Sequence, residues 1–298
     1  MTLPSSGPAI VAIGGGRGLA ASLGALRRVT DDVTAVVSVA DNGGSTGRLR
    51  AAQDQPAPGD LRKCLVALAD PASPLAKSLE YRFDEGELRG HALGNLLLGA
   101  MTDSCGGLVE AIRELEALLG VVGRVCPATV KPVDLVATTT DGATVRGQVD
   151  VMATFDIDRV SLEPAETPAD LGVIEALGRA DLIVLGPGSL FTSVLAAAAV
   201  PDIGDAIRSS GAPLAYICNL RPQPAETAGY GVAKHLDALG RHGLEPAHVL
   251  FDPATIGEAG EVVGARPHGL ADASGEVHDA DLLEKALRSL LEDLDLIG

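Results

Sequence analysis

The stretch AIVAIGGGRG, residues 9–18, decides the fold of this chain. Its first five residues form a short apolar run typical of a buried parallel strand, and three consecutive glycines stop that run. Leucine and alanine then recur at helical spacing over 19–29, and 33–40 is a second β-branched run. A strand, a glycine loop, a helix and a strand in close succession are the signature of a βαβ unit. We therefore expect a parallel sheet to begin here.

Later segments repeat this order. Residues 180–200 have the pattern of a strand, a glycine loop and a helix, and 212–220 and 247–253 have that of buried strands. Helical patterns, the first with Asp60 as its expected N-cap, cover 58–70, 91–102, 108–120, 227–243 and 279–294.

A change of period marks an insertion. Two β-rich runs flank Asp141 and Gly142, which predicts a hairpin within 133–152. The expected fold is therefore α/β and Rossmann-like, with a mostly parallel sheet, helices on both faces and this small β-hairpin insertion. We expect residues 8–298 to form a single nucleotide-binding domain.

The composition excludes several classes of partner. Forty acidic residues against 23 basic ones give a net charge of −17, which would repel a nucleic-acid backbone and an anionic membrane surface. Aromatic residues make up 2% of the chain and Trp is absent, so stacking platforms for bases are not expected. We expect no nucleic-acid partner.

Cysteine usage and the N-terminus both favour a cytoplasmic protein. The four cysteines lie far apart without CxxC spacing, as buried reduced thiols do. The first ten residues lack the pattern of a signal peptide, and no apolar run is long enough to span a bilayer. We expect no membrane insertion.

The first glycine loop is a candidate anion site. Gly14, Gly15, Gly16 and Gly18 allow a sharp turn that brings backbone N–H groups to the mouth of the next helix, where the helix dipole favours an anion. The pattern GxGxxA is also satisfied, and Asp41 stands about where a dinucleotide-binding fold places its ribose acid. An NAD site and a turn without a ligand are both open interpretations.

A second loop, VADNGGSTG at 39–47, argues against NAD. A dinucleotide fold needs an acid there, whereas this loop offers many donors over Asp41, Asn42, Gly43, Gly44 and Ser45. Loops at the ends of neighbouring strands would hold one ligand from two sides. A solvent-exposed turn is the alternative.

Three more segments supply candidates. Gly188 and Ser189 follow the strand pattern of 180–185, although Ser189 could serve only as an N-cap. Asn219 ends another strand pattern, and Asn95 opens an apolar helix near His91, which could equally be a core histidine. The histidines lack zinc-ligand spacing and GxSxG is absent, so we assign no catalytic residue.

Six motifs together resemble the YvcK proteins, also called gluconeogenesis factors, which are relatives of 2-phospho-L-lactate transferase in the CofD-like superfamily. They are AIGGGRGLAASLGALR, VVSVADNGGSTGRLR, PGDLRKCLVALAD, YRFDEGELRGHALGNLLLGAM, LGPGSLFTSVL and NLRPQPAETAGY. The resemblance runs from about residue 8 to 292 and implies a Rossmann-like fold with a nucleotide-binding cleft. It also implies binding of UDP-sugars such as UDP-GlcNAc, a link to central carbon metabolism, cell shape and cell-wall precursor supply, and no settled reaction.

Some residues depart from the family pattern. Asn42 stands where relatives usually have a second Asp, and Asn is a weaker cation ligand than a carboxylate. We therefore assign no metal ligand and no certain cofactor, and leave Mg²⁺ open. Arg17 stands where Thr is more typical and adds positive charge beside the first loop.

Three functional hypotheses follow. The leading one is a cytoplasmic regulatory protein that binds a nucleotide sugar or another nucleotide diphosphate, as a homodimer, with unknown protein partners. The second is an enzyme like 2-phospho-L-lactate transferase, whose branch binds a guanylylated phospholactate and a deazaflavin with Mg²⁺. The third, an NAD-dependent dehydrogenase, rests on GxGxxA alone.

Overall fold

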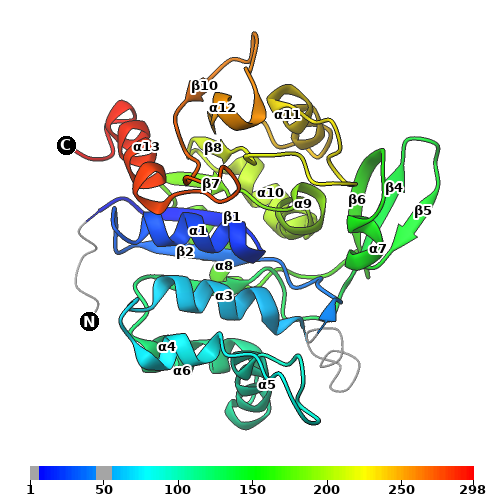
Figure 1. Cartoon of the computed structure of the whole chain (residues 1–298), viewed down its shortest axis with the longest axis vertical. Helices are drawn as coiled ribbons and strands as arrows, with labels where there is room; N and C mark the ends of the chain where they lie inside the picture. The colour runs from blue at the N-terminus through cyan, green and yellow to red at the C-terminus, as the bar shows by residue number, and fades with distance from the viewer. Residues whose placement is uncertain (1–6, 45–55) are drawn as a thin grey trace.

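The computed structural model describes residues 7–44 and 56–298 (Figure 1). Its main layer is a seven-stranded sheet in the order β10-β9-β8-β7-β1-β2-β3, and every adjacent pair is parallel. The strands are β1 (Ile10–Gly14), β2 (Val33–Val37), β3 (Arg124–Pro127), β7 (Leu182–Leu185), β8 (Leu214–Ile217), β9 (His248–Phe251) and β10 (Ala265–Pro267). The predicted Rossmann-like fold with a mostly parallel sheet is confirmed.

The centre of the sheet is apolar because helices cover both of its faces. All residues of β1, β2 and β7 are buried, which is why these strands are continuous apolar runs. The sheet grows from β1 toward β3 in one direction and from β7 toward β10 in the other. The direction of growth therefore reverses between β1 and β7, which creates a topological switch point.

The helices form two layers (Figure 1). On one face lie α1 (Gly16–Leu26), α3 (Pro58–Leu68) and α13 (Ala280–Asp293), which pack side by side. On the other face lie α8 (Leu171–Gly178), the π-helix η1 (Leu190–Val194), α9 (Leu195–Ala198), α10 (Pro201–Ser209) and α11 (Val232–Arg241). Outside α3 lie α4 (Pro74–Leu79), α5 (Leu93–Cys105) and α6 (Leu108–Leu119), and α12 (Pro253–Ile256) follows β9.

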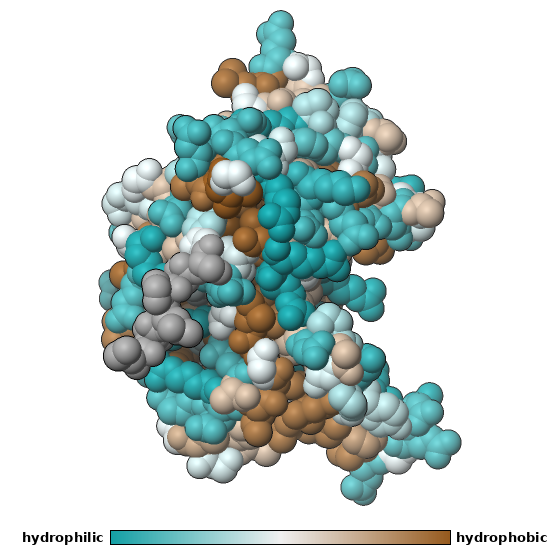
Figure 2. Space-filling model, turned by 90° about the vertical axis from the view of Figure 1, so that its left-hand side faces the viewer, coloured by the Kyte–Doolittle hydropathy of each residue, from teal (hydrophilic) through white to brown (hydrophobic). Residues whose placement is uncertain are grey.

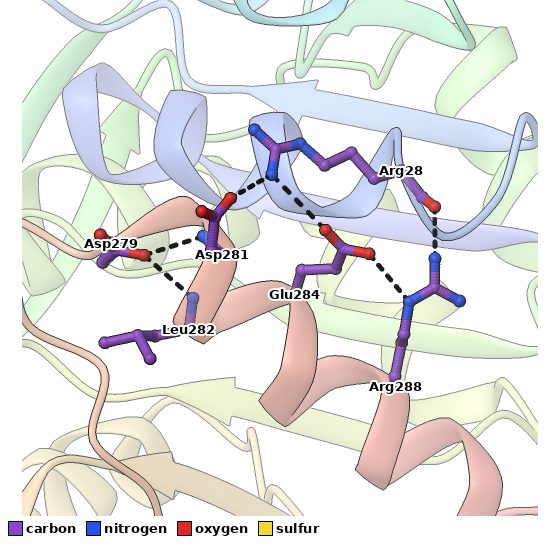
Figure 3. Close-up of polar contacts among 6 residues, drawn as sticks. All are labelled: Arg28, Asp279, Asp281, Leu282, Glu284 and Arg288. Carbon is purple, nitrogen blue, oxygen red and sulfur yellow. Dashed lines mark hydrogen bonds and ion pairs between the residues drawn. The ribbon is translucent and has the colours of Figure 1, made fainter.

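Polar contacts align α13 with α1 (Figure 3). Arg28, just beyond the end of α1, pairs with Asp281 and lies 3.5 Å from Glu284. Glu284 also accepts from Arg288, whose guanidinium donates to the carbonyl oxygen of Arg28. Most of these groups are exposed, so the network itself adds little to stability. The buried apolar face of α13 supplies most of the packing energy.

The insertion is larger than the hairpin predicted for 133–152. It contains a three-stranded antiparallel sheet in the order β5-β4-β6 and the short helix α7. These elements are β4 (Asp134–Thr139), β5 (Thr144–Arg146), α7 (Gln148–Met152) and β6 (Ile157–Glu163). The predicted hairpin with its turn at Asp141 and Gly142 is confirmed, whereas the last five residues of the predicted range form α7. The Asn42 side chain accepts from the amide of Val149 in the first turn of α7, a long-range contact that no local pattern contains.

Two other local predictions also differ. Helix α3 begins at Pro58 with Ala57 in the cap position, so Asp60 is a first-turn residue and not the N-cap. Strands β3 and β10 were not predicted, because Arg and Pro interrupt their apolar pattern.

Among the described residues, no single helix has both the length and the apolarity to cross a bilayer. The segments Leu190–Ala198 and Pro201–Ser209 are long and apolar enough only when taken together, and they are bent by 78° relative to each other.

The closest approach between the β1 and β7 loops gives a stability prediction. A Cβ placed on Gly18 would lie 2.1 Å from the carbonyl oxygen of Pro187, whereas one on Gly24, in the same helix, meets nothing within 4 Å. We expect Gly18→Ala to lower the free energy of unfolding by about 2 kcal/mol or more. Gly24→Ala should raise it by about 0.5–1 kcal/mol, because alanine favours the helix.

Urea denaturation of the two variants and the parent chain checks this. Equal stability of Gly18→Ala and Gly24→Ala would contradict a rigid contact at the switch point.

Candidate functional site

The candidate site lies at the carboxyl edge of the sheet, where the loops after β1 and β7 touch. Gly18 packs against Pro187, and a Cβ on Gly188 would lie 3.4 Å from the carbonyl oxygen of Gly15. Gly16 and Gly188 have φ values of +66° and +125°, which favour glycine. The structure therefore brings the first and third predicted glycine loops together, at the position where open α/β sheets bind ligands.

Asn219 fixes the conformation of the β7 loop. It follows β8, its side chain is buried, and its Oδ1 accepts from the amide of Gly188 at 2.7 Å. Its Nδ2 donates to the carbonyl oxygen of Gly188, also at 2.7 Å. Both ends of the amide are engaged, so Asn219 positions Gly188 in this structure. The sequence predicted its location, and its contact with the loop backbone emerges only from the fold.

Ser189 is oriented by a residue that the sequence pattern did not single out. It is the N-cap residue of η1, as the alternative interpretation expected, but its hydroxyl makes no capping hydrogen bond. Instead, its Oγ accepts from Nε2 of Gln223 at 2.9 Å. The signal that could have identified Gln223 is its place in NLRPQPAETAGY, between Asn219 and the next helix.

Glu226, from the same motif, is a buried acid behind the β7 loop. It is 1% exposed, and its carboxyl faces the hydroxyls of Thr192 and Ser189 and the amides of Thr192 and Leu190. None of these contacts aligns into a full hydrogen bond to either carboxyl oxygen. Burial raises the pKa of Glu226 to about 7, although the hydroxyls and amides oppose this. This group can therefore gain or lose a proton near neutral pH.

Asp60 places a second acid against the first glycine loop. A Cβ on Gly15 would lie 2.7 Å from Oδ2 of Asp60, so the absence of a side chain there admits the carboxylate. The other oxygen, Oδ1, pairs with Lys63 at 2.8 Å. Helix α3 thus directs an acid and a base toward the mouth of α1, with Asp60 almost fully buried.

The second predicted loop joins the sheet to the insertion. Asp41 accepts from the amide of Gly43 at 2.8 Å, and Asn42 accepts from the amide of Val149 at 3.0 Å. Asn42 therefore contacts α7 through its side-chain oxygen. Gly44 follows in the chain, and Ser45 lies outside the described residues.

Asn95 is buried in the first turn of α5, beside Gly94. Gly94 packs against the side chain of Arg62 on α3. The structure therefore places Asn95 in the outer helical layer with α3. Its proposed contact with a ligand stays a prediction.

The described residues contain no cluster of metal-ligating side chains. Among residues 7–44 and 56–298, no group of three or more His, Cys, Asp or Glu side chains is arranged to hold a metal ion. Asp60, beside the glycine loop, has Lys63 as its ionic partner. A metal ion at this edge would need further ligands, such as the oxygens of a bound diphosphate.

A hollow of about 570 Å³ lies at the opposite edge of the sheet, near the amino ends of β7 and β8. Figure 2 shows this side of the molecule, where an apolar band runs between polar residues. The charged groups that line the hollow serve the fold. Arg179 forms two hydrogen bonds with Asp32, and Asp181 accepts from the amide of Ala9. We therefore assign the functional site to the carboxyl edge.

Comparisons with known proteins show which family this chain resembles. The family described as 2-phospho-L-lactate transferase CofD matches residues 10–271. A protein of Deinococcus radiodurans is 46% identical over 257 residues, which cover 85% of this chain and 55% of that protein. The gluconeogenesis factor of Bacillus subtilis is 43% identical over 238 residues, which cover 79% of this chain and 75% of that protein. The chain thus spans little more than half the length of the first of these relatives.

A solved structure has the same fold. The crystal structure of a Bacillus halodurans protein matches with a TM-score of 0.88 at 35% sequence identity. The match covers 95% of this chain and 100% of that one.

Glu226 gives a prediction of pH dependence. Its pKa of about 7 in the folded chain exceeds the ordinary value of 4.5. Its contribution to stability is therefore fully present below pH 4.5 and is lost as the pH rises through 7. Glu226→Gln keeps the neutral form, so its advantage over the parent chain should grow by about 2–3 kcal/mol between pH 5 and pH 8.

Urea denaturation of both proteins at the two pH values measures this advantage, with Glu258→Gln, an exposed glutamate, as the control. A difference that stays constant with pH would show that Glu226 does not titrate near neutrality.

Proposed function

This chain belongs to the CofD family, among the gluconeogenesis factors that its six motifs resemble, and we propose that it binds a nucleotide sugar of the UDP-GlcNAc type. The observation that carries this proposal is the contact of two glycine loops at the switch point. The switch point is where this class of sheet accommodates nucleotides.

The diphosphate would bind at the mouth of α1. The first-turn amides of an α-helix have no partners within the helix, and the dipole adds positive potential at that end. Gly16 leaves room for an anion to approach these amides, because a Cβ there would meet no atom closer than 3.9 Å, whereas the carboxylate of Asp60 occupies the space beside Gly15. Gly188, held by Asn219, would form the opposite wall.

The second loop and the insertion would complete the site. Asp41 could accept hydrogen bonds from sugar hydroxyls, and Asn42 connects this loop to α7. A ligand held between the sheet and the insertion could change how the two contact each other. This arrangement fits a regulatory protein of the cytoplasm that links carbon metabolism with cell shape and cell-wall precursor supply.

A transferase activity is the second candidate. It is favoured by the family match over residues 10–271 and by Asp60 at the glycine loop. A phospholactyl-type group would move from a nucleotide diphosphate to an acceptor, with catalysis by positioning and charge stabilisation. Asp60 and Asp41 are the carboxylates that would hold a Mg²⁺ ion, which would neutralise charge on the diphosphate.

Calorimetric titration of the full chain with UDP-GlcNAc, UDP and GDP tests the binding proposal. We expect saturable binding of UDP-GlcNAc, weakened about tenfold by Asn219→Ala, because the variant frees the backbone of Gly188. Absence of binding of every uridine nucleotide at millimolar concentration would overturn the proposal.

Asp60→Asn separates the two candidates. Without a bridging metal, the variant should bind UDP-GlcNAc more tightly, because it removes a negative charge beside the phosphates. A Mg²⁺-dependent transferase should instead lose both Mg²⁺-dependent binding and turnover of guanylylated phospholactate with deazaflavin. Asp237→Asn, which changes an exposed carboxylate on α11, is the control.

A further inference from the structure

A second hollow opens between α1, α3 and the segment that follows α4. Its volume is about 420 Å³, and its charged lining consists of Arg17, Arg62, Lys63, Arg82 and Glu80. Four cationic side chains thus face one acidic side chain, in a chain whose net charge is −17. This concentration of positive charge needs a physical explanation.

Arg62 is held in this hollow with part of its hydrogen-bonding capacity unused. Its side chain is 3% exposed, its Nη1 donates to the carbonyl oxygen of Leu79, and Glu80 lies 3.6 Å away. Its Nε–H is buried without a hydrogen-bond partner. A buried donor without an acceptor costs free energy.

Gly94 sets the position of this arginine. A Cβ on Gly94 would lie 2.7 Å from Cδ and 2.8 Å from Cγ of Arg62. The missing side chain therefore gives the arginine stem its place against α5. The glycine of the HALGN motif thereby serves the hollow and not a turn.

The charges of the other cations also act on this hollow. The burial of Arg62 and the charge of Arg82 both lower the pKa of Arg62, whereas Glu80 and Asp60 oppose the shift. Arg17 lies in the first turn of α1, which contains no acidic residue. A cation at this end of a helix is unfavourable unless an anion accompanies it.

We propose that this hollow binds the phosphate group of a small phosphorylated molecule. Guanidinium groups match phosphate oxygens with paired, charge-assisted hydrogen bonds, and three arginines line the hollow. Its volume suits a small ligand. The proposal uses only these residues, so it stands whether or not a nucleotide sugar binds at the glycine loops.

The phosphate could come from either of two sources. Arg17 follows Gly16 directly, and Lys63 pairs with Asp60, which lies against Gly15. A ligand seated at the glycine loops could therefore extend a phosphate into the hollow. The other source is a separate phosphorylated metabolite.

Titration calorimetry of the full chain with inorganic pyrophosphate, in a phosphate-free buffer of low ionic strength, tests the proposal. We expect saturable binding that Arg17→Gln and Arg82→Gln each weaken about fivefold or more. Both residues are exposed, so the variants should keep the fold. Arg113→Gln, an exposed arginine on α6, removes the same charge elsewhere and should change little.

Gly94→Ala provides an independent check, because it would displace Arg62 while Arg17 and Arg82 remain. It should also weaken pyrophosphate binding at least fivefold, with the fold monitored by circular dichroism. Repeating the pyrophosphate titration with saturating UDP-GlcNAc identifies the source. Unchanged affinity assigns the hollow to a separate metabolite, and mutual exclusion assigns it to the ligand of the glycine loops.

Two results would overturn the proposal. One is the absence of saturable pyrophosphate binding. The other is binding that both arginine variants leave unchanged and Asn219→Ala abolishes, because pyrophosphate would then bind only at the glycine loops. Failure of UDP-GlcNAc to bind, with arginine-dependent pyrophosphate binding intact, would reject the nucleotide-sugar proposal and leave this one standing.

Discussion

The close contact between the loops that follow β1 and β7 is the constraint on which the candidate site depends. Gly18 lies against the carbonyl oxygen of Pro187, which brings the mouth of α1 and the start of η1 to the same edge of the sheet. The side chain of Asn219, which accepts one hydrogen bond from the backbone of Gly188 and donates another to it, then fixes Gly188 opposite Gly15. The contact of these loops thus determines where an anion can meet backbone donors, and which side chains stand behind them.

Local sequence patterns correctly predicted the strands that are buried along their whole length. Strands such as β1 and β7 are buried on both faces, so apolar runs between glycines identify them. Strands β3 and β10 contain Arg and Pro, which interrupt an apolar run, and they form because the neighbouring strands β2 and β9 offer edges for pairing. Helix α7 lies at the end of the range predicted as a hairpin, and its first turn contacts Asn42, 107 residues away. Prediction therefore failed where distant contacts decide the conformation.

The site divides along the same line. Glycine loops after strands are visible in the sequence because glycine is needed for their backbone conformation, as at Gly16 and Gly188. Asp60 was predicted as an N-cap because aspartate near the start of a helix is typical of that position. In the structure its carboxylate lies against Gly15 instead. Glu226 was missed because a glutamate in a polar loop gives no sign that it will be buried. Its significance comes from burial, which only the fold determines.

Net charge and local charge act at different distances. The surplus of acids repels polyanions from afar, but salt screens such forces within about 10 Å at ordinary ionic strength. Inside that distance, the helix dipole of α1 and the cations near its first turn determine which small anions are stabilised. Lys63 and Asp60 connect this cationic region with the glycine loop, so a charge bound in either place is felt by the other. The expected repulsion of nucleic acid and the proposed binding of small phosphorylated molecules are therefore compatible in one acidic protein, because they depend on different charges.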